Sequence, residues 1–310
     1  MLRSACLASC LALVALPAGA DPNAAPGEPA TAAVLAALPF DPEAAARRKI
    51  VVDLAPRGNL RRMPFQLDTG ATTSAVSPRM ARALGIGVRR VKGDAYRRKT
   101  VLGRDLRFQV VTRRSDTASN SRFEYGLLGG DFLSQYVVEL DFSGRSVRFL
   151  DPKKYAVPAS ASAPDEAVLD LEIVSNRPAV RVSLGARDAL LLLDTGAPPS
   201  LLLSGASARE AGIASAPVPG LALEGILGPV AAELGEVARL EIGPFAFEKI
   251  AAVVAPQGLY NQGFSGDSIL GYDLLAQFLV RIDYPRQRLW LRRDPAAKPL
   301  TDPRRPEPGK

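Results

Sequence analysis

The sequence predicts a mainly β protein made of two lobes with the same fold, related by an internal pseudo-twofold axis and containing few short helices. Its 310 residues are 47% hydrophobic and 23% charged, which is typical of globular proteins. Most patterned segments are short apolar or alternating stretches between Gly and Pro residues, as expected of strands. Two stretches of sequence also recur in the same order, which indicates an internal repeat.

The first twenty residues have the features of a secretory signal peptide. Arg3 is followed by an apolar stretch from Ala5 to Leu16 and by the small-x-small sequence Ala18-Gly19-Ala20. We therefore expect cleavage after Ala20 and export to the periplasm or the medium. The sequence Leu7-Ala8-Ser9-Cys10 also resembles a lipoprotein box, but the apolar stretch before it is short. A membrane anchor is expected only if Cys10 is lipidated, which is the less favoured interpretation.

Composition divides the rest of the chain. Residues 21–39 and 153–167 are expected to be linkers rich in Ala and Pro, and residues 294–310 a solvated, disordered tail. These segments bound two folded units, which we call lobe 1 (residues 40–152) and lobe 2 (residues 168–293). Both cysteines lie in the leader, so the mature lobes must be stabilised by packed cores rather than by disulfides.

The two lobes share two motifs. The stretch from Phe65 to Ala71 matches that from Leu192 to Ala197 around Asp-Thr-Gly, at an offset of 194 − 68 = 126. Residues 127–142 match residues 269–284 at an offset of 271 − 129 = 142. Lobe 2 therefore has 142 − 126 = 16 additional residues between its motifs, and two copies of one fold are the simplest explanation.

The remaining patterns place the individual elements. Strands are predicted at residues 50–54, 62–67, 106–112, 147–150, 169–173, 179–184, 189–193, 237–242, 245–254 and 288–291. Short helices are predicted at residues 78–84, 131–135, 207–211 and 273–277. Ser77 is the expected N-cap of the first, before Pro78, and Asp131 and Asp273 are expected to cap the second and fourth. Asp141 and Asp283 end strands and are expected to lie in turns.

The two Asp-Thr-Gly stretches are candidates for catalysis. Each follows an apolar strand, where an ionised carboxylate is costly unless hydrogen bonds or a shared proton compensate. The glycine has no Cβ, so a second loop can come close, and the threonine hydroxyl can bond across that contact. If the lobes bring Asp68 and Asp194 together, one carboxyl can serve as general base and the other as general acid. Taken singly, each aspartate is better explained as a turn residue, but the matched pair favours catalysis.

The chain has no histidine, which excludes Ser-His-Asp and Cys-His mechanisms and a His-liganded zinc. It also lacks a phosphate-binding loop, a nucleophile elbow and a dinucleotide fingerprint. We therefore expect chemistry that depends on carboxyl groups, with no cofactor and no metal.

With these motifs in corresponding places, the chain resembles the aspartic proteases of the pepsin and retropepsin superfamily, most closely bacterial secreted proteins with two retropepsin-like domains. The resemblance covers about residues 48–152 and 168–293. It implies a closed β-barrel-like lobe in each unit and a catalytic dyad that shares a proton. The implied site residues are the catalytic Asp68 and Asp194, the supporting Thr69, Gly70, Ala71, Thr195, Gly196 and Ala197, and Gly129 and Gly271 at the ends of ψ-shaped loops.

The resemblance also implies hairpin flaps over the substrate, which we place at residues 92–103 and 221–230. One departure concerns the second loop, where Pro198 and Pro199 stand in place of Thr72 and Thr73. The second loop thereby loses hydroxyls that could support its aspartate.

Charge is distributed unevenly. The net charge is +7; lobe 1 has 21 Lys and Arg against 12 Asp and Glu, whereas lobe 2 has 11 against 13. The basic pairs of lobe 1 are scattered and not interleaved with aromatic residues, so we expect solvated faces and no nucleic-acid partner. Attraction to acidic peptides or to an anionic envelope surface is the functional alternative.

The predicted function is hydrolysis of peptide bonds by an exported aspartic endopeptidase, a monomer whose active site lies between its own lobes. A catalytically silent peptide-binding protein with the same fold is one alternative. Another is a dimer in which each lobe pairs with its counterpart in a second chain, placing Asp68 beside Asp68. Residues 24–49 could mask the cleft through Arg47, Arg48 or Lys49, but a plain linker is favoured there.

Overall fold

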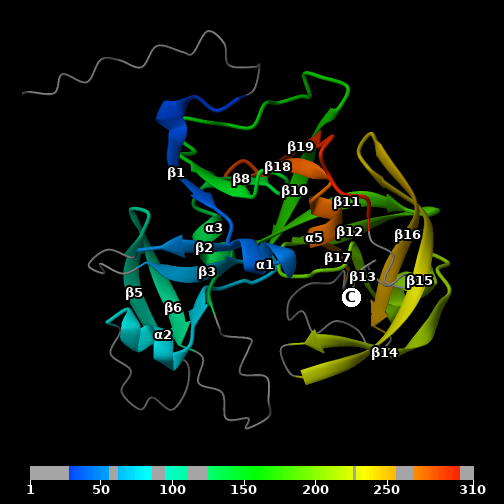
Figure 1. Ribbon diagram of the computed structural model, residues 1–310. Helices are drawn as coiled ribbons and strands as arrows, with labels where there is room; N and C mark the ends of the chain where they lie inside the picture. The colour runs from blue at the N-terminus through cyan, green and yellow to red at the C-terminus, as the bar shows by residue number, and fades with distance from the viewer. Residues whose placement is uncertain are drawn as a thin grey trace, which may run out of the picture.

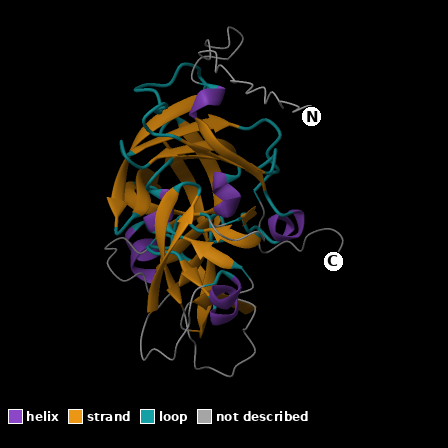
Figure 2. Cartoon of the chain, turned by 90° about the vertical axis from the view of Figure 1, so that its left-hand side faces the viewer, coloured by secondary structure: helices purple, strands orange, loops and turns teal. Residues whose placement is uncertain are grey.

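The structure, a computed structural model, describes residues 28–55, 62–85, 95–110, 125–225, 228–255 and 268–300. Strands dominate these ranges and the helices are short (Figure 2). The predicted mainly β class is confirmed. In the same ranges, no helix is both long and apolar enough to cross a membrane.

The elements follow one another in a similar order in both lobes. Lobe 1 and the segment before it contain the 3₁₀ helix η1 (Thr31–Ala33) and β1 (Val34–Pro39), α1 (Pro42–Ala46), β2 (Val51–Leu54), β3 (Met63–Leu67), β4 (Ala75–Val76), α2 (Pro78–Ala83), β5 (Ala95–Val101), β6 (Arg104–Val110), β7 (Gly126–Leu128), α3 (Gly130–Leu133), β8 (Val137–Asp141) and β9 (Ser146–Leu150). Lobe 2 contains β10 (Glu166–Val174), β11 (Arg177–Leu184), β12 (Arg187–Asp194), β13 (Leu201–Ser204), α4 (Gly205–Glu210), β14 (Ser215–Gly225), β15 (Gly228–Ile242), β16 (Phe245–Ala255), β17 (Ile269–Gly271), α5 (Tyr272–Leu275), β18 (Phe278–Asp283) and β19 (Arg288–Arg293).

The strand orders show the same repeat in three dimensions. Lobe 1 has the order β2-β3-β7-β4-β6-β5, and lobe 2 has β11-β12-β17-β13-β16-β15-β14. In both, a short strand (β7 or β17) lies between the strand that leads to the aspartate and the strand that follows it. In lobe 2, β11 also pairs with β15, so six strands form a ring. The described strands of lobe 1 do not close into such a ring.

A second sheet joins the lobes, in the order β1-β9-β8-β18-β19-β10 (Figure 1). At its centre β8 and β18 are antiparallel, and Glu139 lies opposite Arg281. The offset between these residues, 281 − 139 = 142, equals that of the second sequence motif. The pseudo-twofold axis therefore passes through the Glu139–Arg281 pair.

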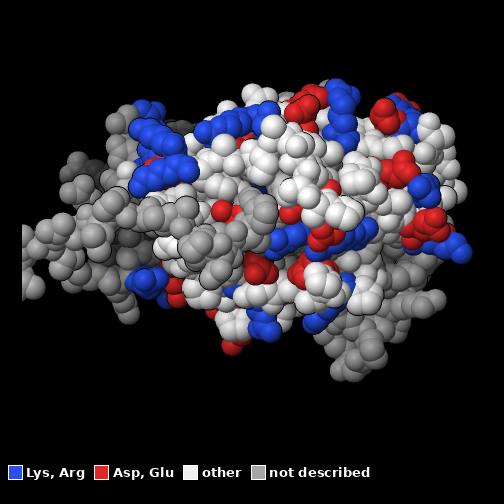
Figure 3. Space-filling model, turned by 90° about the horizontal axis from the view of Figure 1, so that it is seen from above, with Lys and Arg blue, Asp and Glu red and all other residues white. Residues whose placement is uncertain are grey.

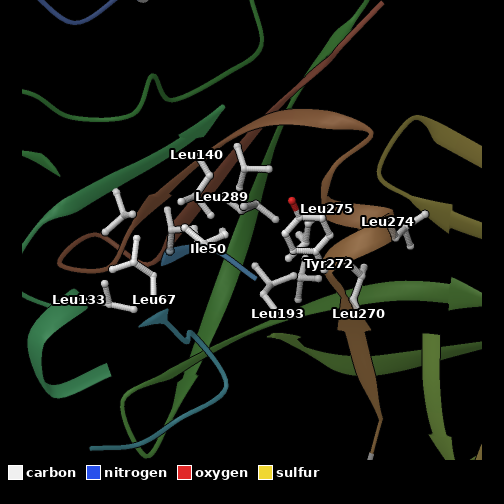
Figure 4. Close-up of a cluster of buried hydrophobic side chains, with 14 of the residues drawn as sticks. Ile50, Leu67, Leu133, Leu140, Leu193, Leu270, Tyr272, Leu274, Leu275 and Leu289 are labelled. Carbon is white, nitrogen blue, oxygen red and sulfur yellow. The ribbon is translucent and has the colours of Figure 1, made fainter. Parts of the chain in front are cut away.

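Apolar side chains from both lobes meet beside this sheet. Figure 4 shows Ile50, Leu67, Leu133 and Leu140 of lobe 1 close to Leu193, Leu270, Tyr272 and Leu289 of lobe 2. They belong to one continuous cluster of buried residues that extends into both lobes. This shared core fixes the lobes against each other, because separating them would expose it to water.

The other face of the joining sheet carries a buried cluster of charges. The Arg281 side chain is completely buried; its Nε donates to Oε2 of Glu139 at 2.6 Å, and its guanidinium stacks on Trp290 at 4.1 Å. Glu28 reaches the same guanidinium at 3.0 Å and also pairs with Arg148 and Arg292. Glu28 thus connects β9 of lobe 1 with β18 and β19 of lobe 2.

The predicted linkers have more structure than their composition suggests. Residues 34–39, inside the range predicted as a linker, form β1 and pair with β9. In the range 153–167, Val157 is buried in an apolar cluster and donates its amide to Asp283, and β10 begins at Glu166. In the predicted tail, residues 294–300 are placed, and Lys298 accepts a hydrogen bond from Gln277. Residues 301–310 lie outside the described residues, as do residues 1–27 with the leader.

The segment proposed as a mask has other contacts. Arg47 donates to the Tyr125 hydroxyl at 2.6 Å, and the Lys49 ammonium lies 5.8 Å from the centre of the Tyr125 ring. Arg48 forms an ion pair with Asp273 at 2.7 Å. These contacts, together with β1 in the joining sheet, make the segment an integral part of the fold.

The first predicted helix is confirmed: α2 begins after Ser77, whose hydroxyl accepts from the amide of Met80 at 3.2 Å. The predicted capping by Asp131 and Asp273 is wrong, because the N-caps of α3 and α5 are Gly129 and Gly271, without a side-chain bond. The two aspartates instead make contacts outside their own helices. The predicted turn role of Asp141 is confirmed by a bond from the amide of Gly144.

The face seen in Figure 3 has Lys and Arg side chains interspersed with Asp and Glu side chains. The exposed pair Arg181–Glu172, at 2.6 Å, is an example of this mixed pattern in lobe 2. Mixed charge of this kind is what a solvated surface requires.

Candidate active site

Each predicted catalytic aspartate lies at the end of a buried strand. Asp68 follows β3, and its amide donates to the carbonyl of Leu128 on β7 at 3.0 Å. Asp194 is the last residue of β12 and lies opposite Gly271 of the parallel strand β17. Because β7 and β17 occupy equivalent places, each aspartate lies at the same position in its own lobe, at the lobe boundary.

Four hydrogen bonds made by Thr69 and Thr195 join the two loops, two of them between the threonines themselves. The amide of each threonine donates to the hydroxyl of the other, at 3.1 and 3.0 Å. Each hydroxyl in turn donates to a backbone carbonyl of the opposite lobe: Thr69 to Leu193 at 2.7 Å and Thr195 to Leu67 at 2.8 Å. Both threonines are almost fully enclosed, at 1% and 0% exposure, so these bonds do not compete with water.

The glycines after the threonines face the aspartates of the opposite lobe. A Cβ on Gly70 would overlap the carboxyl group of Asp194, and one on Gly196 would lie 2.6 Å from Oδ2 of Asp68. A side chain in either place would displace the opposite carboxyl group, so glycine allows the carboxyls their close approach. Ala71 and Ala197 complete the loops, each donating its amide to the carbonyl of its own aspartate.

The two carboxyl groups face each other across the lobe boundary and interact electrostatically, and both residues are half-buried. Burial raises the pKa of Asp68 well above its ordinary value, and the charge of Asp194 raises it further. Burial also raises the pKa of Asp194, against the opposing effect of bonds from the amides of Gly196 and Ala197. A pair with these properties holds one proton over a range of pH, so an acid and a base stand side by side.

The predicted ψ-loop glycines lie where the two segments of each lobe cross. A Cβ on Gly129 would lie 2.8 Å from the backbone of Thr73, and one on Gly271 would lie 2.6 Å from the carbonyl oxygen of Ala197. The amide of the following residue donates to the alanine of the aspartate loop in both lobes, at 2.7 Å. The crossing therefore supports the aspartate loops from behind.

A further support in lobe 1 was missed by the sequence analysis. The Asp131 carboxylate accepts bonds from the amide and the hydroxyl of Ser74, at 2.8 and 2.6 Å, and that hydroxyl accepts from the amide of Gly129 at 3.0 Å. Burial raises the pKa of Asp131, and the bonds from Ser74 oppose this effect. The available signal was the serine six residues after each aspartate, Ser74 and Ser200.

Lobe 2 has different contacts at the equivalent positions. The amide of Gly271 donates to the backbone carbonyl of Ser200 at 3.0 Å rather than to its hydroxyl. Asp273, the counterpart of Asp131, pairs with Arg48 of lobe 1. Asp273 therefore links the two lobes.

The prolines of the second loop do not weaken the contacts of its aspartate. Thr73, the counterpart of Pro199, has its hydroxyl 3.4 Å from Oε1 of Gln109, away from the dyad. The carbonyl of Pro198 accepts the amide of Asp273 as that of Thr72 accepts the amide of Asp131. This backbone contact is therefore the same in both lobes.

The predicted flaps fall on hairpins only in part. Residues 221–230 span the tip of the β14–β15 hairpin, of which residues 226 and 227 lie outside the described residues. The turn at Leu102–Gly103 joins β5 and β6, and β6 pairs in parallel with β4 as β16 pairs with β13. The Leu102–Gly103 turn is therefore the counterpart of the β15–β16 turn, not of the β14–β15 hairpin. The C-terminal end of the first predicted flap was thus placed on the wrong hairpin. Residues 92–94 are not described.

Among the described residues, no group of three or more His, Cys, Asp or Glu side chains gathers as a metal site. The chemistry that these residues can perform is proton transfer between two carboxyls and a molecule bound beside them.

Comparison with known proteins agrees with this geometry. The sequence model of the aspartyl protease family matches residues 180–274, which lie in lobe 2. A search of curated proteins found no match to the chain.

Several solved structures are similar to parts of the chain. A retropepsin-like aspartic protease from Rickettsia conorii has 20% identity, with 41% of this chain and 89% of that chain covered and a TM-score of 0.30. Basic 7S globulin from soybean has 13% identity, coverage of 83% and 93%, and a TM-score of 0.45. An aspartic proteinase from Irpex lacteus has 12% identity, coverage of 86% and 99%, and a TM-score of 0.49. The match to the aspartyl protease family model spans the Asp-Thr-Gly loop of lobe 2, and lobe 1 contributes a second such loop that is bonded to it; in these features the chain is similar to aspartic proteases.

Proposed function

We propose that the protein is an aspartic endopeptidase that hydrolyses peptide bonds with Asp68 and Asp194. The observation that carries the proposal is the close approach of the two carboxyl groups, held by the reciprocal bonds of Thr69 and Thr195. The raised pKa of Asp68, caused by burial and by the charge of Asp194, supports a dyad with a single shared proton.

The dyad supplies both proton transfers that the reaction needs. The ionised carboxyl takes a proton from water as the water oxygen bonds to the carbonyl carbon of the substrate. The protonated carboxyl gives its proton to the carbonyl oxygen, which yields a neutral tetrahedral intermediate. The carboxyl that took the proton from water then gives it to the amide nitrogen, while the other carboxylate takes a proton from a hydroxyl of the intermediate; the carbon–nitrogen bond breaks, with an acid and an amine as products. Each step conserves the one proton of the dyad.

The lobes of one chain provide both halves of this proposed site. Self-pairing of two copies of lobe 1 would place Glu139 against Glu139 at the axis, and two copies of lobe 2 would place Arg281 against Arg281. Like charges facing each other in a buried sheet are costly, whereas Glu139 and Arg281 of one chain compensate each other. We therefore favour a monomer over the dimer with Asp68 beside Asp68.

Export is part of the proposal and is supported by the leader sequence of residues 1–20. N-terminal sequencing of the protein recovered from the periplasm or the medium is expected to begin at Asp21. A chain that keeps its leader and stays in the cytoplasm would contradict export but not peptide hydrolysis.

The test is cleavage of a diverse peptide pool by the purified mature chain from acid to neutral pH. We expect cleavage by the wild type and a loss of at least about 1000-fold for Asp68→Asn and for Asp194→Asn, because each removes one proton carrier. Asp141→Asn is the matched control, since this aspartate caps an exposed turn and should leave cleavage unchanged. Peptide binding by a folded wild type that cuts nothing would instead support the silent peptide-binding alternative.

A further inference from the structure

Lobe 2 has a buried cation beside its aspartate. Arg177 is the first residue of β11 and is only 3% exposed. In the β11–β12 register Ala179 lies opposite Leu192, so the next equivalent position places Arg177 opposite Asp194. Burial lowers the pKa of Arg177 and raises the pKa of Asp194, and against these effects each charge stabilises the charged form of the other residue.

The position of Arg177 is fixed from both lobes. It follows the turn of Ser175 and Asn176, which both have left-handed backbone angles, as in a tight two-residue hairpin. The Asn176 carbonyl packs against Gly130 of α3, where a Cβ would overlap it. The Arg177 Nε donates to the carbonyl of Val174 at 3.3 Å. The guanidinium is therefore held in place by the hairpin, and the hairpin is held by lobe 1.

Lobe 1 has a different arrangement at the equivalent position. Val51 lies opposite Gln66 in the β2–β3 register, so the position equivalent to Arg177 is Lys49, opposite Asp68. Lys49 is only half-buried, and its ammonium lies near the Tyr125 ring. The strongest effects on Asp68 are its burial and the charge of Asp194, both of which favour the protonated form.

The backbone amides act on both carboxyls alike: those of Gly70 and Ala71 lower the pKa of Asp68, and those of Gly196 and Ala197 lower the pKa of Asp194. Asp194 faces Asp68 from the β3 loop, Arg177 from β11 and the amides of Gly196 and Ala197. Tyr284, after β18, senses the charge of Asp68 and is kept neutral because burial raises its pKa. Of these groups, Arg177 is the cation whose charge acts on Asp194.

We propose that Arg177 is a positioning residue that decides which carboxyl of the dyad holds the shared proton: its guanidinium keeps Asp194 ionised and leaves the proton on Asp68. This inference rests on the proposed function for its catalytic meaning. In that reaction Asp194 is the base that activates water, and Asp68 is the acid that protonates the carbonyl oxygen. The proton assignment itself can be tested whether or not the chain cuts peptides.

The experiment is a pH titration of the carboxyl signals of the full chain by carbon NMR, with labelled aspartate and with Asp68→Asn and Asp194→Asn used for assignment. We expect Arg177→Met to move the titration of the dyad upward by about one pH unit, because an opposite charge is removed. Arg177→Lys should restore most of the difference. Arg181→Met, on the same strand in an exposed ion pair, should change nothing. Titration of Arg177→Met at the wild-type position would overturn the proposal.

Two further measurements separate this effect from simple loss of structure. Arg177→Gln keeps a donor for the Val174 carbonyl without the charge, and is expected to shift the titration as Arg177→Met does. In the wild-type chain, the side-chain Nε–H signal of Arg177 should follow the ionisation of Asp194, and a signal that ignores it would also overturn the proposal. If the chain cuts peptides, the acid limb of kcat/KM should move upward in Arg177→Met by the same amount.

Discussion

The side chains behind the two aspartate loops have different partners: Asp131 bonds within lobe 1, whereas Asp273 of lobe 2 pairs across the lobe boundary. In lobe 1, Ser74 connects the loop to Asp131 and Gly129. In lobe 2, Asp273 forms an ion pair with Arg48 of lobe 1 instead. The backbone contacts behind both loops have nevertheless stayed the same. The comparison shows that the backbone contacts needed for close approach of the loops are the same in both lobes, whereas the charged contacts around them differ.

The largest expected effect comes from the axis, where the lobes differ in the sign of one charge. Glu139→Arg places a second cation beside the buried Arg281, and we expect the free energy of unfolding to fall by about 4 kcal/mol. Combining it with Arg281→Glu should recover part of the loss, because opposite charges face each other again. Urea denaturation measures both. Glu172→Arg, in an exposed pair with Arg181, is the control and should cost less than about 1 kcal/mol. If Glu139→Arg and Glu172→Arg lowered the free energy of unfolding equally, the charge pair at the axis would have no special role in stability.

The next effect tests the serines that occupy matching positions. Ser74→Ala removes the hydroxyl bond to the half-buried Asp131 carboxylate and the bond that this hydroxyl accepts from the Gly129 amide, and we expect a loss of about 2 kcal/mol in the free energy of unfolding. Ser200→Ala is the matched control and should lose less, because the backbone carbonyl of Ser200, not its hydroxyl, accepts from Gly271. A larger loss in Ser200→Ala than in Ser74→Ala would contradict the comparison.

The aspartates themselves should differ in their effect on stability with pH. Because the folded chain holds the proton of Asp68 more tightly than the unfolded chain, the free energy of unfolding falls as pH rises from the ordinary pKa of 3.8 to the raised folded value. Asp68→Asn should therefore increase the free energy of unfolding at pH 7 by about 1.4 kcal/mol for each unit by which the pKa is raised. Its Tm at pH 7 should rise accordingly. Asp194→Asn should raise it less, since Arg177 already stabilises the Asp194 charge. Thermal unfolding at pH 4 and pH 7 measures the difference, and a lower Tm of Asp68→Asn at pH 7 would refute it.

The smallest effect concerns the ion pair across the boundary. The Arg48 and Asp273 side chains are 34% and 14% exposed, so Arg48→Ala should lower the free energy of unfolding by about 0.5 to 1 kcal/mol. Added salt should reduce the loss by screening, and Arg48→Lys should retain part of the interaction. Urea denaturation at low and high salt measures it. A loss that does not change with salt would assign the effect to packing of the β1–β2 connection.

The sequence predicted the repeat, the aspartates, the threonines and the glycines, because those positions are constrained by close contact and differ little between the lobes. The sequence analysis failed for residues whose role is decided by partners far away along the chain and not by their neighbours in sequence. Asp131 and Asp273 read locally as helix caps, yet their partners Ser74 and Arg48 lie far away along the chain. The strand at residues 34–39 escaped prediction because Ala and Pro are poor strand formers, and its pairing with β9 overrides that preference.

The exchanged threonine bonds also bear on the order in which the chain can fold. The hydroxyl of Thr69 donates to a carbonyl 124 residues further along, and that carbonyl belongs to the other lobe. Contacts of such long separation form late, since a large loop must close first. A nascent chain that has delivered only its N-terminal half therefore contains one aspartate loop without its interlock. The interlocked loops that carry the dyad therefore require both lobes to have been synthesised.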